Sequence, residues 1–240
     1  MYAITGITGK VGGNVACTLL AAGLPVRAVV RDAGKGRPWV EKNCEVAIAS
    51  IDDADSLTKA FSGVDGVFLM TPPDFDPEPG FPKTHEAIAA VKAAISAAQP
   101  AKVVFLSTVG AQVADFSLLN NSKITEEGLR SASVPIAFLR AAWFMENSSW
   151  DVEAARAGVV PSFLQPLDHP IPMVATADIG STAANLLRES WRVYVSSNSK
   201  DRAAIRPTIL PQALLRRSAV PYGWNRCRET HGSPCSARRE

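Results

Sequence analysis

The chain has 240 residues, 47% of them hydrophobic, and a formal net charge of +2 at pH 7. This length and composition suit one globular domain with a substantial core and exclude a disordered chain. No stretch of about 18 apolar residues predicts a membrane span, and no early segment has the charged flank of a signal peptide. We therefore expect a cytoplasmic protein without a membrane partner.

The positive charge is concentrated near the C-terminal end. Residues 191–240 hold nine arginines and one lysine against three acidic residues, a local charge of +7, so residues 1–190 carry −5. The basic segment contains no recognisable nucleic-acid-binding module, and we predict no nucleic-acid partner. The cysteines lack metal-ligand spacing, so we expect reduced thiols and no metal site. They are Cys17, Cys44, Cys227 and Cys235.

A glycine-rich loop follows the first expected strand, Tyr2–Thr5, and opens a helix. Gly6 permits a tight turn, Gly9 lets the backbone approach a pyrophosphate, and Gly12 lets the helix pack closely on the strand. The free N–H groups at the start of this helix attract an anion. A second strand, Pro25–Val30, completes a βαβ unit, which is the context that a dinucleotide-binding loop requires.

The end of the second strand indicates which dinucleotide binds. Arg31 is the first residue beyond the apolar run, and Lys35 adds a second positive charge. An arginine here can bind the 2′-phosphate of NADP, whereas an acidic residue accepts hydrogen bonds from the ribose 2′-hydroxyl of NAD. The pattern favours NADP. Asp32 keeps NAD open, because a shift of one residue in register would exchange the two roles.

Further apolar runs alternate with helical segments along the chain. The further expected strands are Cys44–Ala49, Gly66–Met70, Lys102–Leu106 and Pro135–Leu139. The later expected helices begin at about Asp52 and cover about Lys83–Ala98, Ser122–Ser131 and Ala177–Glu189. Six strands alternating with helices predict the α/β class, with a doubly wound parallel sheet of Rossmann type.

Two polar residues are candidates for catalysis near the carboxyl edge of this sheet, where ligands bind. Ser107 follows an apolar strand, and its hydroxyl can reach a nicotinamide or an acceptor carbonyl, or serve only as a turn residue. Lys123 can stabilise negative charge on an acceptor oxygen if it points inward. With Glu126 and Glu127 on the same helix, Lys123 is more often just a solvated side chain.

Five separated motifs occur in an order that is typical of one enzyme family. They are Gly6–Gly13, Thr71–Phe75, Ser107–Gly110, Leu139–Asn147 and Ala177–Gly180. Together they resemble the NmrA-like family of atypical short-chain dehydrogenase/reductases, and more closely its NAD(P)H-dependent quinone or dye reductases. The resemblance runs from Met1 to about Trp191.

The resemblance implies an NADPH-dependent oxidoreductase that transfers a hydride to a quinone-like or other conjugated small molecule. It implies that Arg31 meets the adenosine ribose and that Thr71 and Pro72 line the nicotinamide side. The loop between the cofactor and the acceptor would consist of Ala142, Trp143 and Phe144. The residues implied to wrap the pyrophosphate are Gly6, Thr8, Gly9, Lys10, Val11 and Gly12.

Two departures from the family pattern matter. Ser50 stands where the family usually has an Asp near the adenine, which leaves the adenine contacts open. The Tyr-x-x-x-Lys pair of ordinary short-chain dehydrogenases is absent, because no tyrosine has a lysine four residues later. Reduction of a quinone or dye mainly needs an acceptor stacked on the nicotinamide, whereas alcohol dehydrogenation needs a base. The alternative hypothesis is an NAD(P)-binding redox sensor that does not turn the cofactor over.

We expect three parts in the chain. Residues 1–150 form an NAD(P)-binding domain, residues 151–191 a partial acceptor-binding lobe, and residues 192–240 an atypical basic tail. The tail has scattered prolines, clusters of Arg and Ser, and no sustained periodicity. It is either a non-native end, which would leave the lobe incomplete, or a divergent segment that docks on the core. The sequence is compatible with a monomer or a homodimer.

Overall fold

A six-stranded parallel sheet forms the centre of the computed structural model, which describes residues 1–74, 76–113, 117, 119–159 and 171–191. The strands are β1 (Tyr2–Ile4), β2 (Val26–Val30), β3 (Glu45–Ile48), β4 (Gly66–Leu69), β5 (Val103–Thr108) and β6 (Ile136–Ala141). Their spatial order is β3-β2-β1-β4-β5-β6. The order reverses beside β1, which creates the crevice where doubly wound folds bind ligands. The predicted fold class is confirmed.

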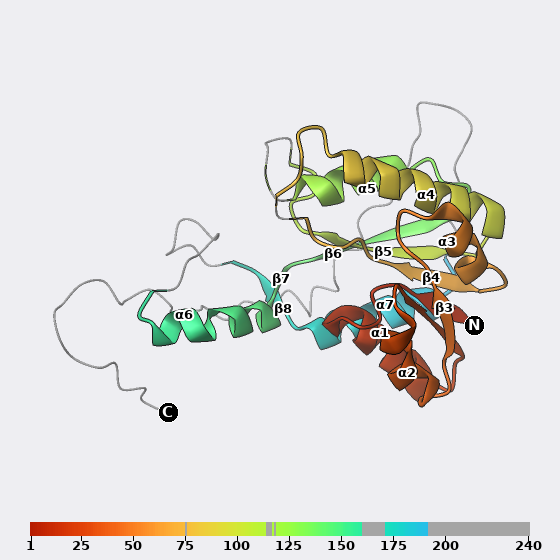
Figure 1. Ribbon diagram of the computed structural model, residues 1–240, viewed down its shortest axis with the longest axis horizontal. Helices are drawn as coiled ribbons and strands as arrows, with labels where there is room; N and C mark the ends of the chain where they lie inside the picture. The colour runs from red at the N-terminus through yellow and green to blue at the C-terminus, as the bar shows by residue number, and fades with distance from the viewer. Residues whose placement is uncertain (75, 114–116, 118, 160–170, 192–240) are drawn as a thin grey trace.

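Helices cover both faces of the sheet (Figure 1). One layer contains α1 (Lys10–Ala21), α2 (Ala33–Val40) and α7 (Thr176–Arg188). The other layer contains α3 (Ala54–Phe61), α4 (Pro82–Ala98) and α5 (Asn120–Leu129). Two buried apolar clusters, one under each layer, are formed where the helices pack on the strands. Val104 and Phe105 belong to different clusters because neighbouring residues of a strand point to opposite faces.

Helix α2 was not predicted from the sequence. Its two glycines and Pro38 lower the intrinsic helix propensity of the segment. Two contacts compensate for them. The Asp32 carboxylate caps the helix by accepting a hydrogen bond from the Gly34 N–H at 2.7 Å, and the Trp39 side chain is buried in the core.

A smaller segment extends from the end of β6. It contains β7 (Trp143–Phe144), a 3₁₀ helix η1 (Met145–Asp151), α6 (Val152–Arg156) and β8 (Met173–Val174). Strands β7 and β8 pair in parallel, and α6 lies away from the two main layers in Figure 1. The predicted tail over 192–240 lies outside the described residues. In the part of the chain that the structure describes, no helix has the length and apolar character needed to cross a bilayer.

Candidate dinucleotide and acceptor site

The glycine loop has the geometry that its spacing predicts. Gly6 has a φ of +60°, which only glycine adopts readily, and a side chain there would overlap the Met70 thioether. A methyl group on Gly12 would overlap the backbone carbonyl of Gly6. Gly9 precedes α1 at the N-cap position, and no side chain caps this helix start among the described residues. The loop is therefore a tight turn that leaves the start of α1 open to an anion.

Two cations follow β2, the strand that pairs with β1. Arg31 is exposed immediately after the strand, and Lys35 is exposed on the first turns of α2. Asp32, which could have accepted a ribose hydroxyl, has one carboxylate oxygen engaged at the start of α2. The structure thus gives Asp32 a structural role that the sequence did not reveal.

An open groove of about 590 Å³ runs beside the glycine loop. It brings together Thr8, Gly9, Lys10 and Lys35, which were all predicted to bind the cofactor. Arg31 is not among the residues that line it. Thr71 and Pro72, predicted for the nicotinamide side, follow β4 at the same edge of the sheet and likewise lie outside this groove.

Hydrogen bonds fix the loop that contains Thr71 and Pro72. Asn121, in the first turn of α5, donates from Nδ2 to the carbonyl oxygen of Asp74 at 3.1 Å. The same side chain accepts a hydrogen bond from the Thr84 hydroxyl of α4 at 2.8 Å. The amide of Asn121 therefore ties this loop to the starts of α4 and α5.

The predicted loop between cofactor and acceptor is joined to both α1 and α7. Ala142 is buried, and Trp143 and Phe144 pair with β8. Just beyond them, the carbonyl oxygen of Glu146 accepts a hydrogen bond from the Lys10 ammonium at 3.3 Å. Lys10 thus connects the glycine loop with a segment that lies 136 residues further along the chain.

The Glu146 carboxylate accepts hydrogen bonds at the start of α7. The Thr176 backbone N–H donates to both carboxylate oxygens at 3.0 Å, and the Thr176 hydroxyl donates at 2.8 Å. Partial burial opposes the negative charge, but these hydrogen bonds outweigh it and hold the pKa of the Glu146 carboxyl below its ordinary value of 4.5. Gly180, one turn further, packs so closely on α1 that a methyl group there would lie 2.5 Å from the Asn14 Cβ.

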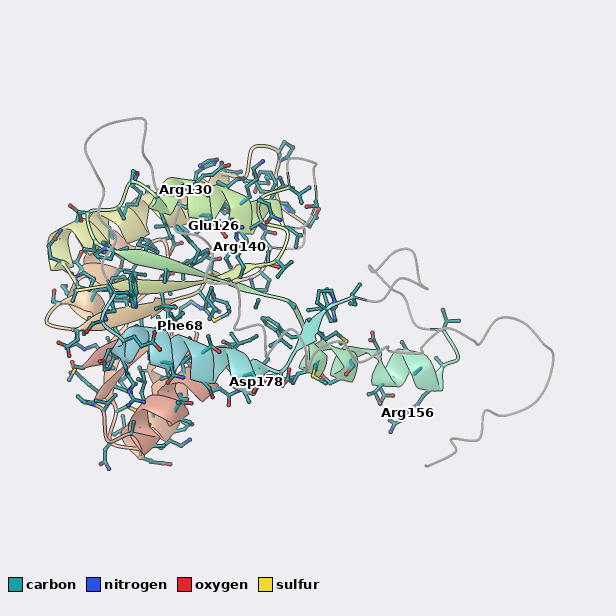
Figure 2. The ribbon with its side chains drawn as sticks, turned by 180° about the vertical axis from the view of Figure 1, so that it is seen from behind. Phe68, Glu126, Arg130, Arg140, Arg156 and Asp178 are labelled. Atoms are coloured by element: carbon teal, nitrogen blue, oxygen red, sulfur yellow. The ribbon has the colours of Figure 1, made fainter. Side chains whose placement is uncertain are left out.

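The Ser107 hydroxyl is hydrogen-bonded to a buried ion pair that was not predicted. Glu126 on α5 is 2% exposed and accepts hydrogen bonds from the Arg140 Nε at 2.8 Å and from an Arg140 terminal nitrogen at 2.6 Å. The Ser107 hydroxyl donates to the same carboxylate. Figure 2 shows Glu126 and Arg140 where α5 faces the sheet.

This network bears on both predicted catalytic residues. Glu126, the acidic neighbour of Lys123 on the same helix, is not at the solvated surface, because its carboxylate is buried against Arg140. Lys123 itself is half-buried, and its ammonium has no partner within the described residues. One signal in the sequence could have revealed the pair: Arg140 interrupts an otherwise apolar strand, and a charge in such a place needs a partner.

Comparison with known proteins identifies the family. Residues 2–197 match the model of the NmrA-like family. The chain belongs to the NmrA-like family. Curated relatives of this NmrA-like protein include a (4-alkanoyl-5-oxo-2,5-dihydrofuran-3-yl)methyl phosphate reductase from Streptomyces griseus, which is 30% identical and is matched over 90% of this chain and 74% of its own length. An NAD(P)H azoreductase from Xenophilus azovorans is 27% identical over 78% of this chain and 63% of its own length.

A solved structure agrees with the fold. The NADPH-dependent quinone oxidoreductase from Escherichia coli, complexed with NADPH, is 26% identical and superposes with a TM-score of 0.67. The match covers 80% of this NmrA-like chain and 66% of the other chain. The chain thus spans a little under two thirds of the azoreductase and of the quinone oxidoreductase.

Proposed function

We propose that this protein is an NADPH-dependent oxidoreductase that transfers a hydride to a quinone-like or other conjugated acceptor. The observation that carries the proposal is the pair of exposed cations, Arg31 and Lys35, after the end of β2, which is the strand paired with β1 ahead of the uncapped helix start. Because Asp32 is engaged at α2, the tip of β2 offers positive charge to a 2′-phosphate, which NADP has and NAD lacks. NAD remains the second choice of cofactor.

In this proposal the glycine loop holds the pyrophosphate. The residues assigned to it are Gly6, Thr8, Gly9, Lys10, Val11 and Gly12. Backbone N–H groups at the start of α1 bind the phosphate oxygens, and the Lys10 ammonium adds charge while its contact with Glu146 orients it. Arg31 and Lys35 bind the 2′-phosphate. The bound nicotinamide supplies the hydride, and the chain supplies its orientation.

The acceptor is proposed to stack on the nicotinamide between two loops. One loop contains Thr71 and Pro72 after β4, and the other contains Trp143 and Phe144 after β6. Correct stacking is the main requirement, because a neutral quinone that takes the hydride becomes an anion that water can protonate, and a cationic dye that takes it becomes neutral. We assign Lys123 to the stabilisation of that charge. The Ser107 hydroxyl, which is engaged by Glu126, is a weaker candidate.

The named relatives favour the reductase over the redox sensor, because those reported above are reductases or oxidoreductases. We also propose that the protein acts in the cytoplasm on a free small molecule, as a monomer or a homodimer. Residues 1–150 would bind the cofactor, and residues 151–191 would contribute to the acceptor side.

A steady-state assay tests the proposal. Purified protein is mixed with NADPH and a panel of quinones, azo dyes and triarylmethane dyes, and the loss of nicotinamide absorbance is followed. Turnover above the rate without protein supports the reductase. Binding of NADP(H) without oxidation of NADPH across the panel would favour the sensor.

A further inference from the structure

The ion pair between Glu126 and Arg140 lies directly below the carboxyl edge of the sheet. Ser107 and Arg140 are paired residues of β5 and β6, and the next pair, Thr108 and Ala141, ends both strands. Both carboxylate oxygens of Glu126 are engaged by Arg140, so the buried charge is paired. A buried ion pair is weak evidence for stability, since its desolvation offsets much of the attraction. Its place at the end of two strands points to a positioning role.

Arg140 also contacts the turn that follows β5. One of its terminal nitrogens donates to the Gln112 side-chain oxygen at 3.3 Å. We call residues 108–113 the β5 turn. Backbone hydrogen bonds from Ala111 to Thr108 and from Val113 to Gly110 close it, and Gly110 has a φ of +91°. A single guanidinium therefore links α5, β6 and the β5 turn.

The β5 turn presents apolar side chains at the ligand-binding edge. Val109 is 47% exposed and Val113 is 44% exposed. Val109 directly follows the end of β5, an interior strand between β4 and β6, and Val113 ends the β5 turn. Exposed valines at this edge suit a flat, apolar ligand, because covering them removes apolar surface from water.

We infer that the β5 turn forms one wall of the acceptor site, and that Arg140 and Gln112 are positioning residues that hold this wall in place for a planar apolar acceptor. The inference rests on the proposed function. It names the acceptor class as one that contacts the enzyme through an apolar ring face rather than through a charged group. Glu126 acts through Arg140 by fixing the direction of its guanidinium.

Exposed residues give the clean test, because changes at Glu126 or Arg140 would also disturb the core. Gln112 is exposed, so Gln112→Ala removes the hydrogen bond from Arg140 at little cost to folding. Val109→Thr and Val113→Thr keep the shape of the side chain and make it polar. There are two matched controls. Gln99→Ala, at the C-terminal end of α4, removes an exposed amide that donates a hydrogen bond to the Ser133 hydroxyl. Val40→Thr changes an exposed valine at the end of α2.

The measurements are KM and kcat for 1,4-naphthoquinone, the Kd for NADPH and the melting temperature. Gln112→Ala and each valine variant should raise the KM for 1,4-naphthoquinone about fivefold, with the Kd for NADPH and the melting temperature unchanged. The two controls should leave the KM unchanged. A role confined to folding would instead lower the melting temperature and leave the KM as it is.

The outcomes separate the inference from the proposed function. If the wild-type chain reduces the quinone and no variant changes the KM, the inference is overturned and the proposed function stands. A rise in the valine variants alone overturns the positioning role of Arg140 and Gln112. If the wild-type chain binds NADPH but reduces no acceptor, the proposed function fails, and the inference fails with it.

Discussion

Glu146 and Thr176 lie 30 residues apart, and the carboxylate of the first accepts hydrogen bonds from the backbone N–H and the hydroxyl of the second. This contact gives α7 an N-terminal cap that comes from outside the helix, because Ala175 at the N-cap position has no side chain that could serve. The backbone of Glu146 also meets Lys10. One residue thus joins the glycine loop, the loop after β6 and the start of α7.

Glu146→Ala removes this cap. Loss of a capping side chain costs about 1 kcal/mol, and for a protein of this size we expect the melting temperature to fall by about 2–4 °C. The matched control is Glu153→Ala, whose exposed ion pair with Arg156 should contribute little. Thermal unfolding of both variants checks the prediction, and equal melting temperatures for the two would contradict it.

The shifted pKa of the Glu146 carboxyl should make the free energy of unfolding depend on pH. Burial raises the pKa of Glu146 and the hydrogen bonds from Thr176 lower it by more, so the folded-state pKa lies below 4.5. A carboxyl whose pKa is depressed on folding stabilises the native state above its ordinary pKa, and this contribution disappears as the pH falls through the folded value. The free energy of unfolding of the wild type should therefore exceed that of Glu146→Gln at neutral pH, and the difference should shrink below pH 4.5. A constant difference across that range would contradict the assignment.

Gly12→Ala tests the close approach in the glycine loop. The added methyl group would overlap the Gly6 carbonyl, which forms part of the proposed pyrophosphate site. We expect the Kd for NADPH to rise about tenfold or more, with a lower melting temperature. Gly23→Ala is the control, because Gly23 also has a positive φ, +73°, yet has open space around it at the far end of α1. That variant should lose stability while it keeps the affinity for NADPH.

Arg31→Ala tests the choice of NADP over NAD. A charge-assisted hydrogen bond to phosphate contributes about 1.5–3 kcal/mol, so the Kd for NADPH should rise about 10- to 100-fold, whereas the Kd for NADH should stay the same. Arg37→Ala removes another exposed arginine of the same region and should change neither value. An equal loss of affinity for both cofactors in Arg31→Ala would refute the assignment.

Lys123→Ala tests the charge-stabilising role. We expect kcat with a quinone to fall about tenfold while the Kd for NADPH stays constant, because the ammonium would act on the acceptor in the transition state. Lys123→Arg should recover part of the rate. Lys59→Ala, at the end of α3, is the control for the loss of one lysine. An unchanged kcat in Lys123→Ala would contradict this role and show that Lys123 is only a solvated side chain.

Much of the fold could be predicted because it follows from local sequence patterns. The six strands are apolar runs bounded by turn residues, and the structure places each within one or two residues of its predicted range. Gly6 was predicted from the need for a tight turn, and its positive φ confirms it. Helix α2 could not be predicted, because its stability comes from the Asp32 cap and the buried Trp39 rather than from helix propensity.

The contacts of the candidate site were harder to predict because they join distant segments. Ser107, Glu126 and Arg140 belong to three elements, and no spacing along the chain shows that their side chains meet. The same holds for Glu146 and Thr176. The sequence predicted that ligands bind at the carboxyl edge of the sheet, and only the structure shows which polar groups there are already engaged.

Single-turnover kinetics tests the central claim most directly. The protein is saturated with NADPH and mixed rapidly with 1,4-naphthoquinone, and the nicotinamide absorbance is followed beside a mixture without protein. We expect a decay far faster than in that mixture, slowed when the hydride of NADPH is replaced by deuterium. Tight binding of NADPH with no decay beyond the mixture without protein would contradict the reductase and favour the redox sensor.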